Sequence, residues 1–241
     1  MVTHSFSVDW KGELAERGQD TCLPSGRIAF GSSKVPWLDP FAGAARELVL
    51  LATTVREIDR LVKRSAANAA STWGRSLKLT LPVGNVRRWK RVEPLLQELL
   101  HWLTDDAWQF CFVDDHNAPM VQAQMFAEHP LKGADAVALF SGGLDSVAGA
   151  DVWLSGGGNG YLFTVSGDNV HAKHSGAAAR VLQALYPDRT SLLAITHQLR
   201  GACPVENSQR TRGFFFFAVA AAIAHEVKVR RIITFEAGVG A

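Results

Sequence analysis

The pattern of hydrophobic and polar residues becomes regular in the second half of the chain. After Asp135, short apolar runs alternate with longer segments in which apolar residues recur at helical spacing. The runs predict four strands, at 136–140, 160–166, 191–196 and 231–235. The segments between them predict helices at 147–154, 175–185 and 208–226. Strands that alternate with helices are typical of parallel sheets, so this half is expected to be an α/β domain with a doubly wound parallel sheet.

The first half of the chain shows a less regular pattern. It predicts amphipathic helices at 39–64 and 89–103 and strands at 76–83 and 108–113. These elements are not arranged as repeated strand–helix units. We therefore expect a small α+β accessory domain over 1–130, followed by the α/β domain over 131–241.

Composition favours a cytoplasmic globular enzyme. Hydrophobic residues make up 47% of the 241 residues and charged residues 20%, which is ordinary for a globular chain. The apolar run 214–224 is too short to cross a bilayer, and the first residues lack the layout of a secretory signal. Cys22, Cys111 and Cys203 are widely spaced, so they indicate neither a disulfide framework nor a zinc site.

Charge is distributed unevenly, although the net charge is only +2. Between Thr54 and Arg91, ten basic residues stand against Glu57 and Asp59. Such a segment could attract an acidic protein or RNA, with Trp73 and Trp89 as aromatic anchors. A solvated helix face followed by a charged loop would give the same pattern, so both interpretations stay open at this stage.

The segment Ser141-Gly142-Gly143-Leu144-Asp145-Ser146 joins the first predicted strand of the α/β domain to its helix. A turn of this kind directs backbone N–H groups and the positive end of the helix dipole towards one point, which favours a phosphate. The two glycines let the backbone approach the anion, and the two serine hydroxyls can donate hydrogen bonds. Asp145 can hold Mg²⁺ against phosphate oxygens. The segment lacks the lysine of a Walker A loop, so it is a different phosphate motif.

Loops at the carboxyl ends of the other strands can complete such a site, because ligands of doubly wound sheets bind at that edge. Ser166 ends the second predicted strand and is a candidate nucleotide contact. Arg210 and Arg212 stand where the long apolar helix is expected to begin. Two arginines in a first helical turn are unfavourable to the dipole, which favours a role in clamping phosphates.

Ser141–Ser146 resembles the signature of the PP-loop ATP pyrophosphatases, which have an adenine nucleotide alpha hydrolase-like fold. Together with Arg212–Ala218 before an alanine-rich helix, it is similar to the QueC-like family, the 7-cyano-7-deazaguanine synthases. Ser208–Phe214 and the N-terminal domain resemble QueC-like proteins of bacterial antiphage (antiviral) defence, the QatC type. The resemblance implies an ATP-dependent ligase that adenylates a carboxylate or amide, releases pyrophosphate and lets a nitrogen nucleophile displace AMP.

The resemblance also implies a set of site residues and partners. ATP and Mg²⁺ would be the cofactors, with the metal on Asp145 and with Asp145 and Arg212 as catalytic residues. The nucleotide would be bound by Ser141, Gly142, Gly143, Leu144, Asp145, Ser146, Ser166 and Arg210. A protein of a defence system is the expected macromolecular partner, and no membrane is expected.

Two departures from the family pattern leave alternatives open. The chain has no cysteine-rich zinc site, and it stops at Ala241, where the family continues through further sheet and helix, so we expect a fragment or a shortened variant. One alternative is a tRNA-modifying PP-loop ligase that uses the basic segment as an RNA platform. The other is a non-catalytic nucleotide-binding subunit of a defence complex.

Overall fold

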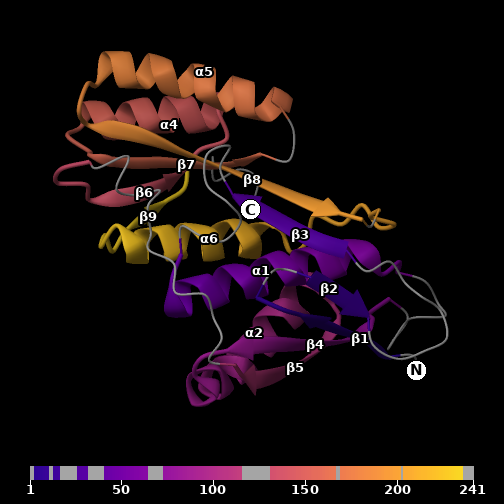
Figure 1. Cartoon of the computed structure of the whole chain (residues 1–241). Coiled ribbons are helices and arrows are strands. Elements are labelled where there is room, and N and C mark those ends of the chain that lie inside the picture. Colours follow the sequence, from indigo (N-terminus) through magenta and orange to yellow (C-terminus); the bar gives the residue numbers. More distant parts are fainter. Residues whose placement is uncertain are drawn as a thin grey trace. The chain divides into compact units, whose positions relative to one another are not determined.

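In a computed structural model of the chain, residues 3–10, 13–16, 26–31, 41–64, 73–115, 131–166, 169–201 and 203–235 are described. They belong to two compact units, each assembled from three segments (Figure 1). Unit 1 comprises 1–29, 46–120 and 199–215, and unit 2 comprises 30–45, 121–198 and 216–241. Neither unit is continuous in sequence, so the two units do not test the predicted boundary at residue 130, which stays a prediction.

Unit 1 is built on a mixed sheet in the order β5-β4-β1-β2-β3. Its strands are β1 (Thr3–Val8), β2 (Glu13–Glu16), β3 (Gly26–Gly31, which ends in unit 2), β4 (Ser76–Val83) and β5 (Ala107–Asp114). β4 pairs in parallel with β1 and with β5, whereas β1, β2 and β3 pair antiparallel. The predicted strands at 76–83 and 108–113 are confirmed, and β1 to β3 are strands that the sequence analysis did not predict.

Two helices accompany this sheet. α1 spans Gly43–Leu61 and α2 spans Val86–Thr104, in agreement with the predicted helices. Asn85 caps α2 by accepting a hydrogen bond from the Arg88 amide at 3.0 Å, and Asp105 ends it in the left-handed conformation (φ 64°). α2 packs on β5, where the Trp89 ring stacks on Phe112 with 5.4 Å between their centroids.

Unit 2 contains a four-stranded parallel sheet in the order β8-β7-β6-β9. The strands are β6 (Ala136–Leu139), β7 (Gly160–Ser166), β8 (Thr190–Arg200) and β9 (Ile232–Ile233). The helices are α4 (Leu144–Ser155), α5 (Asn169–Leu185) and α6 (Arg212–Glu226), the last of which begins in unit 1. The predicted α/β class is confirmed, and the arrangement is compatible with a Rossmann-like fold.

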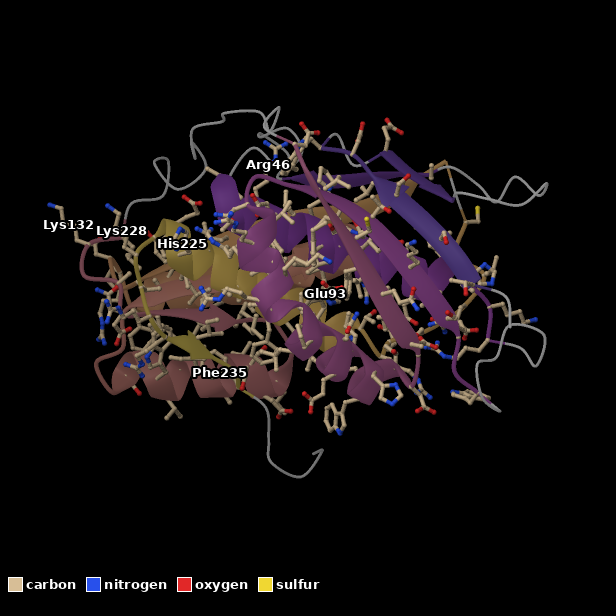
Figure 2. The ribbon with its side chains drawn as sticks, turned by 90° about the horizontal axis from the view of Figure 1, so that it is seen from below. Arg46, Glu93, Lys132, His225, Lys228 and Phe235 are labelled. Atoms are coloured by element: carbon tan, nitrogen blue, oxygen red, sulfur yellow. The ribbon has the colours of Figure 1, made fainter. Side chains whose placement is uncertain are left out.

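Helices cover both faces of the parallel sheet (Figure 1). α4 and α5 share one face, where Ala150, Leu154 and Leu182 pack with β6 and β7 in a buried core. α6 lies on the other face and buries its small side chains, as expected from its alanine-rich sequence. Phe235 packs against α4, where the absence of a side chain at Gly149 leaves room for its ring (Figure 2). Among the described helices, none is both long and apolar enough to cross a membrane.

Candidate functional site

The predicted phosphate turn lies between β6 and α4 in unit 2. β6 is buried and paired on both sides, and the amide of Phe140 donates to the Phe163 carbonyl at 2.8 Å. The chain then turns at Gly142, whose φ of 78° lies in the left-handed region. A Cβ at this position would stand 2.6 Å from the Cα of Ser175 on α5. Both the backbone conformation and the contact with α5 therefore require glycine here.

The two serine hydroxyls of the turn contact each other. The oxygens of Ser141 and Ser146 lie 3.1 Å apart, and the Ser146 hydroxyl donates to the Gly143 carbonyl at 2.9 Å. The Gly143 amide in turn donates to Ser141 Oγ at 3.2 Å. Ser146 is buried and Ser141 is exposed. These bonds fix the shape of the turn, and Ser141 is the serine that a ligand can reach from solvent.

The first turn of α4 is open to solvent. Gly143 is its N-cap residue, and no side chain of the described residues caps it. The Leu144 side chain is 85% exposed, so this residue contributes backbone rather than packing. Asp145 is exposed in the same turn. An uncapped helix start has backbone N–H groups without intrahelical partners and a positive dipole end, which together suit an anion.

Ser166 reaches the same edge of the sheet as the phosphate turn. It is the last residue of β7, which is parallel to β6, and it is paired with Thr196 of β8. Only its backbone is described. The loop at 155–160 precedes β7 and therefore lies at the opposite edge, as the sequence predicted. There the Arg189 guanidinium donates to the Gly158 carbonyl at 2.9 Å, which gives this loop a structural partner.

Arg210 and Arg212, the other predicted site residues, belong to unit 1. Arg210 precedes α6, so the prediction that both arginines stand in its first turn is wrong for this residue. Its guanidinium donates to the Thr104 carbonyl at 3.4 Å and lies over the Trp73 ring, 5.9 Å from the centroid. Arg212 is the first residue of α6 and is exposed.

A buried network of charges lies beside Arg210 and was not found by sequence reasoning. Arg75 is fully buried and forms ion pairs with Asp59, at 2.6 Å, and with Asp106, at 2.5 Å. Arg64 contacts the same two carboxylates at 3.0 and 2.8 Å. The guanidinium groups of Arg64 and Arg75 thus share the two carboxylates inside unit 1. The available signal was Asp59 itself, a carboxylate next to the apolar residues Ile58, Leu61 and Val62 of the predicted helix.

This network places the side chains of Arg64 and Arg75 from the basic segment inside unit 1, whereas Lys63, Lys78, Arg87, Arg88, Lys90 and Arg91 are exposed. Arg60, Arg64, Arg75 and Lys90 of this segment form ion pairs with carboxylates. Trp89, expected as a stacking surface, is buried, and its indole N–H donates to the Glu47 carboxylate. Burial lowers the pKa of Arg56, and the nearby charges of Arg60 and Arg212 lower it further against the opposing effect of Glu57. Arg64, Arg75 and Trp89 are therefore structural, whereas the basic residues at the start of α2 are exposed.

The turn fits Mg²⁺ only as an ion shared with a ligand. Across the described part of the chain, no cluster of three His, Cys, Asp or Glu side chains is arranged to hold a metal. At the turn itself, Asp145 supplies a single exposed carboxylate. A hard cation would therefore take most of its oxygens from phosphate and water, which is the usual situation for Mg²⁺ bound with a nucleotide.

Comparison with known proteins gives no assignment. No family model matches the chain, no curated protein is detectably similar to it, and no solved structure matches it.

Proposed function

We propose that this chain binds ATP through the turn 141–146 and uses it to adenylate a carboxylate or amide, with release of pyrophosphate. The observation that supports this best is the uncapped start of α4 behind Gly142, which has a φ of 78° and contacts α5 closely. Such a turn at the carboxyl edge of a parallel sheet exposes amides to an anion. The step from phosphate binding to adenylation rests on the resemblance of Ser141–Ser146 to the PP-loop signature.

In this proposal, the turn and Arg212 bind the phosphate groups and compensate their charge. The backbone amides at the start of α4 and the Ser141 hydroxyl bind phosphate oxygens. Asp145 would hold Mg²⁺ at the turn, and the ion would supply positive charge to offset that of the phosphates. Arg212 is exposed at the start of α6, and its assignment to the charge of the leaving pyrophosphate rests on the resemblance alone.

In the reaction, a substrate oxygen attacks the α-phosphorus of ATP. The bond between this phosphorus and the bridging oxygen to the β-phosphorus breaks, and pyrophosphate leaves with the electron pair. A nitrogen nucleophile then displaces AMP from the activated carbon. The chain contributes orientation and charge stabilisation, so no covalent bond to the protein is needed.

The exchange of radioactive pyrophosphate into ATP tests this function, in the presence of candidate carboxylates and amides. Asp145→Asn should abolish exchange and weaken Mg²⁺–ATP binding without changing thermal unfolding. Asp135→Asn is a matched control, because Asp135 precedes β6 at the opposite edge and pairs there with Arg231 at 3.1 Å. Equal binding and exchange by Asp145→Asn and the parent protein would refute the proposal.

A second candidate is a nucleotide-binding subunit without catalysis. It is favoured by the single carboxylate at the turn within the described residues. It predicts Mg²⁺–ATP binding that depends on Asp145, but no pyrophosphate exchange with any acceptor. Arg212→Ala separates the two candidates further, because an adenylating enzyme should lose exchange while it retains nucleotide affinity.

A further inference from the structure

Helix α2 of unit 1 carries an apolar stripe on its solvent side. Val92, Leu95, Leu99 and Trp102 are 38%, 67%, 38% and 81% exposed. Their spacing of three, four and three residues is that of successive a and d positions in a heptad, so they follow one line along the helix. The buried side chains of α2, which include Trp89, Leu96 and Leu100, lie along a neighbouring line of the helix. Glu93 marks the position of this helix in Figure 2.

Single exposed apolar side chains are common on proteins and need no explanation. Four in register on one helix, ending in a tryptophan, form a contiguous patch instead. Aromatic residues on such a patch are typical of the centres of protein interfaces. Such a patch is typical of a docking surface.

The charges of α2 indicate which partner fits this surface. Arg87, Arg88, Lys90 and Arg91 are exposed in its first two turns. The first turn contains no acidic residue, and Glu93 in the second forms an ion pair with Lys90 at 3.1 Å, so Arg87, Arg88 and Arg91 supply the basic end of the helix. Cations at a helix start are unfavourable to its dipole, so they destabilise α2 itself. At the far end, Asp105 is exposed beside the negative end of the dipole. The helix is thus basic at one end and acidic at the other.

We propose that a second copy of this chain docks antiparallel on α2 across a two-fold axis between Leu95 and Leu99. In this arrangement Val92 faces Trp102 of the second copy, and Leu95 faces Leu99 of the second copy. Each a position then meets a d position, as in antiparallel helix pairs. Arg88 and Arg91 come to lie opposite Asp105 of the second copy. A two-fold contact of this kind uses one self-complementary patch twice.

The size of the surface determines the strength of the contact. α2 has 19 residues, and at 1.5 Å per residue it is about 28 Å long. A contact made by one such helix is smaller than the ~800 Å² per partner of a standard interface. The dimer is therefore weak, and its population depends on protein concentration. Glu98 lies near the axis and faces its own copy, so Glu98→Gln should tighten association by about two- to fivefold.

Sedimentation velocity of the whole chain over a wide range of concentration tests this proposal. The parent protein should shift reversibly from monomer to dimer. Trp102→Glu should weaken association by at least about 30-fold, as expected for an interface tryptophan. Val152→Glu is the matched control, because Val152 is 71% exposed on α4 and should leave association unchanged. Circular dichroism confirms that both variants fold.

A charge exchange tests the antiparallel orientation. Arg88→Glu/Arg91→Glu and Asp105→Lys should each weaken self-association, whereas a mixture of the two variants should form a heterodimer at least as tight as either homodimer. A chain that stays monomeric at every concentration overturns the proposal. This holds also where the stripe binds a helix of another protein. Failure of the mixture to associate overturns the antiparallel contact. These results do not depend on nucleotide binding, so they are separable from the proposed function.

Discussion

Thr211 donates its hydroxyl hydrogen to the carboxylate of Asp59 at 3.0 Å, across 152 positions of the sequence. Both residues are fully buried in unit 1, and Ser208 hydrogen-bonds the same carboxylate. The segment before α6 is therefore hydrogen-bonded to α1 through the hydroxyl groups of Ser208 and Thr211. A structural role accounts for Ser208 and Thr211, whereas Arg212 of the same segment is exposed.

Removal of the Asp59 carboxylate should strongly destabilise unit 1. Asp59→Ala leaves the buried guanidinium of Arg75 with one carboxylate in place of two, and Thr211 without its acceptor. Breaking a buried ion network from one side costs about 3–5 kcal/mol in the free energy of unfolding. Urea denaturation measures this difference.

The matched control is Glu93→Ala, which removes an ion pair with the exposed Lys90. Exposed ion pairs contribute about 0–1 kcal/mol to the free energy of unfolding, so this variant should have nearly the stability of the parent protein. If both variants lose the same stability, the buried network does not have the role assigned to it.

The stability of the fold should fall in acid, with opposite contributions from two residues of α1. Burial raises the pKa of Asp59, but the hydrogen bonds from Ser208 and Arg75 and the charge of Arg75 outweigh it, so the net pKa is lowered. Its stabilisation is present above the ordinary carboxyl pKa and is lost as the pH falls through that value towards the lowered one. Burial also raises the pKa of Glu57, and there Arg60 and Arg56 offset it only in part. Glu57 therefore favours the folded state at low pH and loses this contribution as the pH rises through its raised pKa.

Unfolding free energies measured from neutral to acidic pH test these signs. Asp59→Asn should flatten the decline in acid, whereas Glu57→Gln should steepen it, because the proton uptake that favours the folded state is gone. Parallel curves for the parent and both variants would show that neither pKa differs between the folded and unfolded states.

The sequence predicted the α/β half well because its pattern is local. The strands at 136–140 and 160–166 are apolar runs, and the turn between β6 and α4 is marked by its own glycines. β1 was missed although Ser5, Phe6, Ser7 and Val8 alternate and both apolar residues are buried. The run is short and carries polar residues, and its partner β4 lies some 70 positions away, with Thr3 pairing with Ser76. The alternation alone is too short to predict a strand, and the long-range pairing that stabilises β1 is not visible in the local sequence.

The charged residues were harder to interpret than the apolar ones. A count of charges treated Arg64 and Arg75 as surface residues, because their partner Asp106 lies far along the chain and the count did not include it. Burial of an ion pair depends on the tertiary structure, which the local composition does not record. The Gly142 turn could be predicted because its requirement for glycine is local, apart from the contact with Ser175.

Trp89 should contribute to stability rather than to binding of nucleic acid. Its indole N–H donates to Glu47, a buried carboxylate that also accepts from the Gly84 amide at 3.0 Å. Trp89→Phe keeps a ring for stacking on Phe112 but leaves Glu47 short of a donor, which should cost about 1–3 kcal/mol. Denaturant unfolding measures the loss, with the exposed Trp102 changed to Phe as a control that should unfold like the parent protein. RNA binding that fell in the Trp89 variant while its stability was unchanged would contradict this assignment.

Gly142→Ala should abolish phosphate binding at the turn. An alanine in the left-handed region costs about 1 kcal/mol, and its Cβ would lie 2.6 Å from the Cα of Ser175, so the turn must move away from α5. The amides at the start of α4 move with it, and the dissociation constant for Mg²⁺–ATP should rise at least about tenfold. Gly176→Ala is the neighbouring control on α5, because a Cβ there meets nothing within 4 Å and alanine favours a helix by roughly 0.5–1 kcal/mol. Isothermal titration calorimetry with Mg²⁺–ATP should therefore give weak binding for Gly142→Ala and parental binding for Gly176→Ala, and equal affinities would show that ATP binds elsewhere.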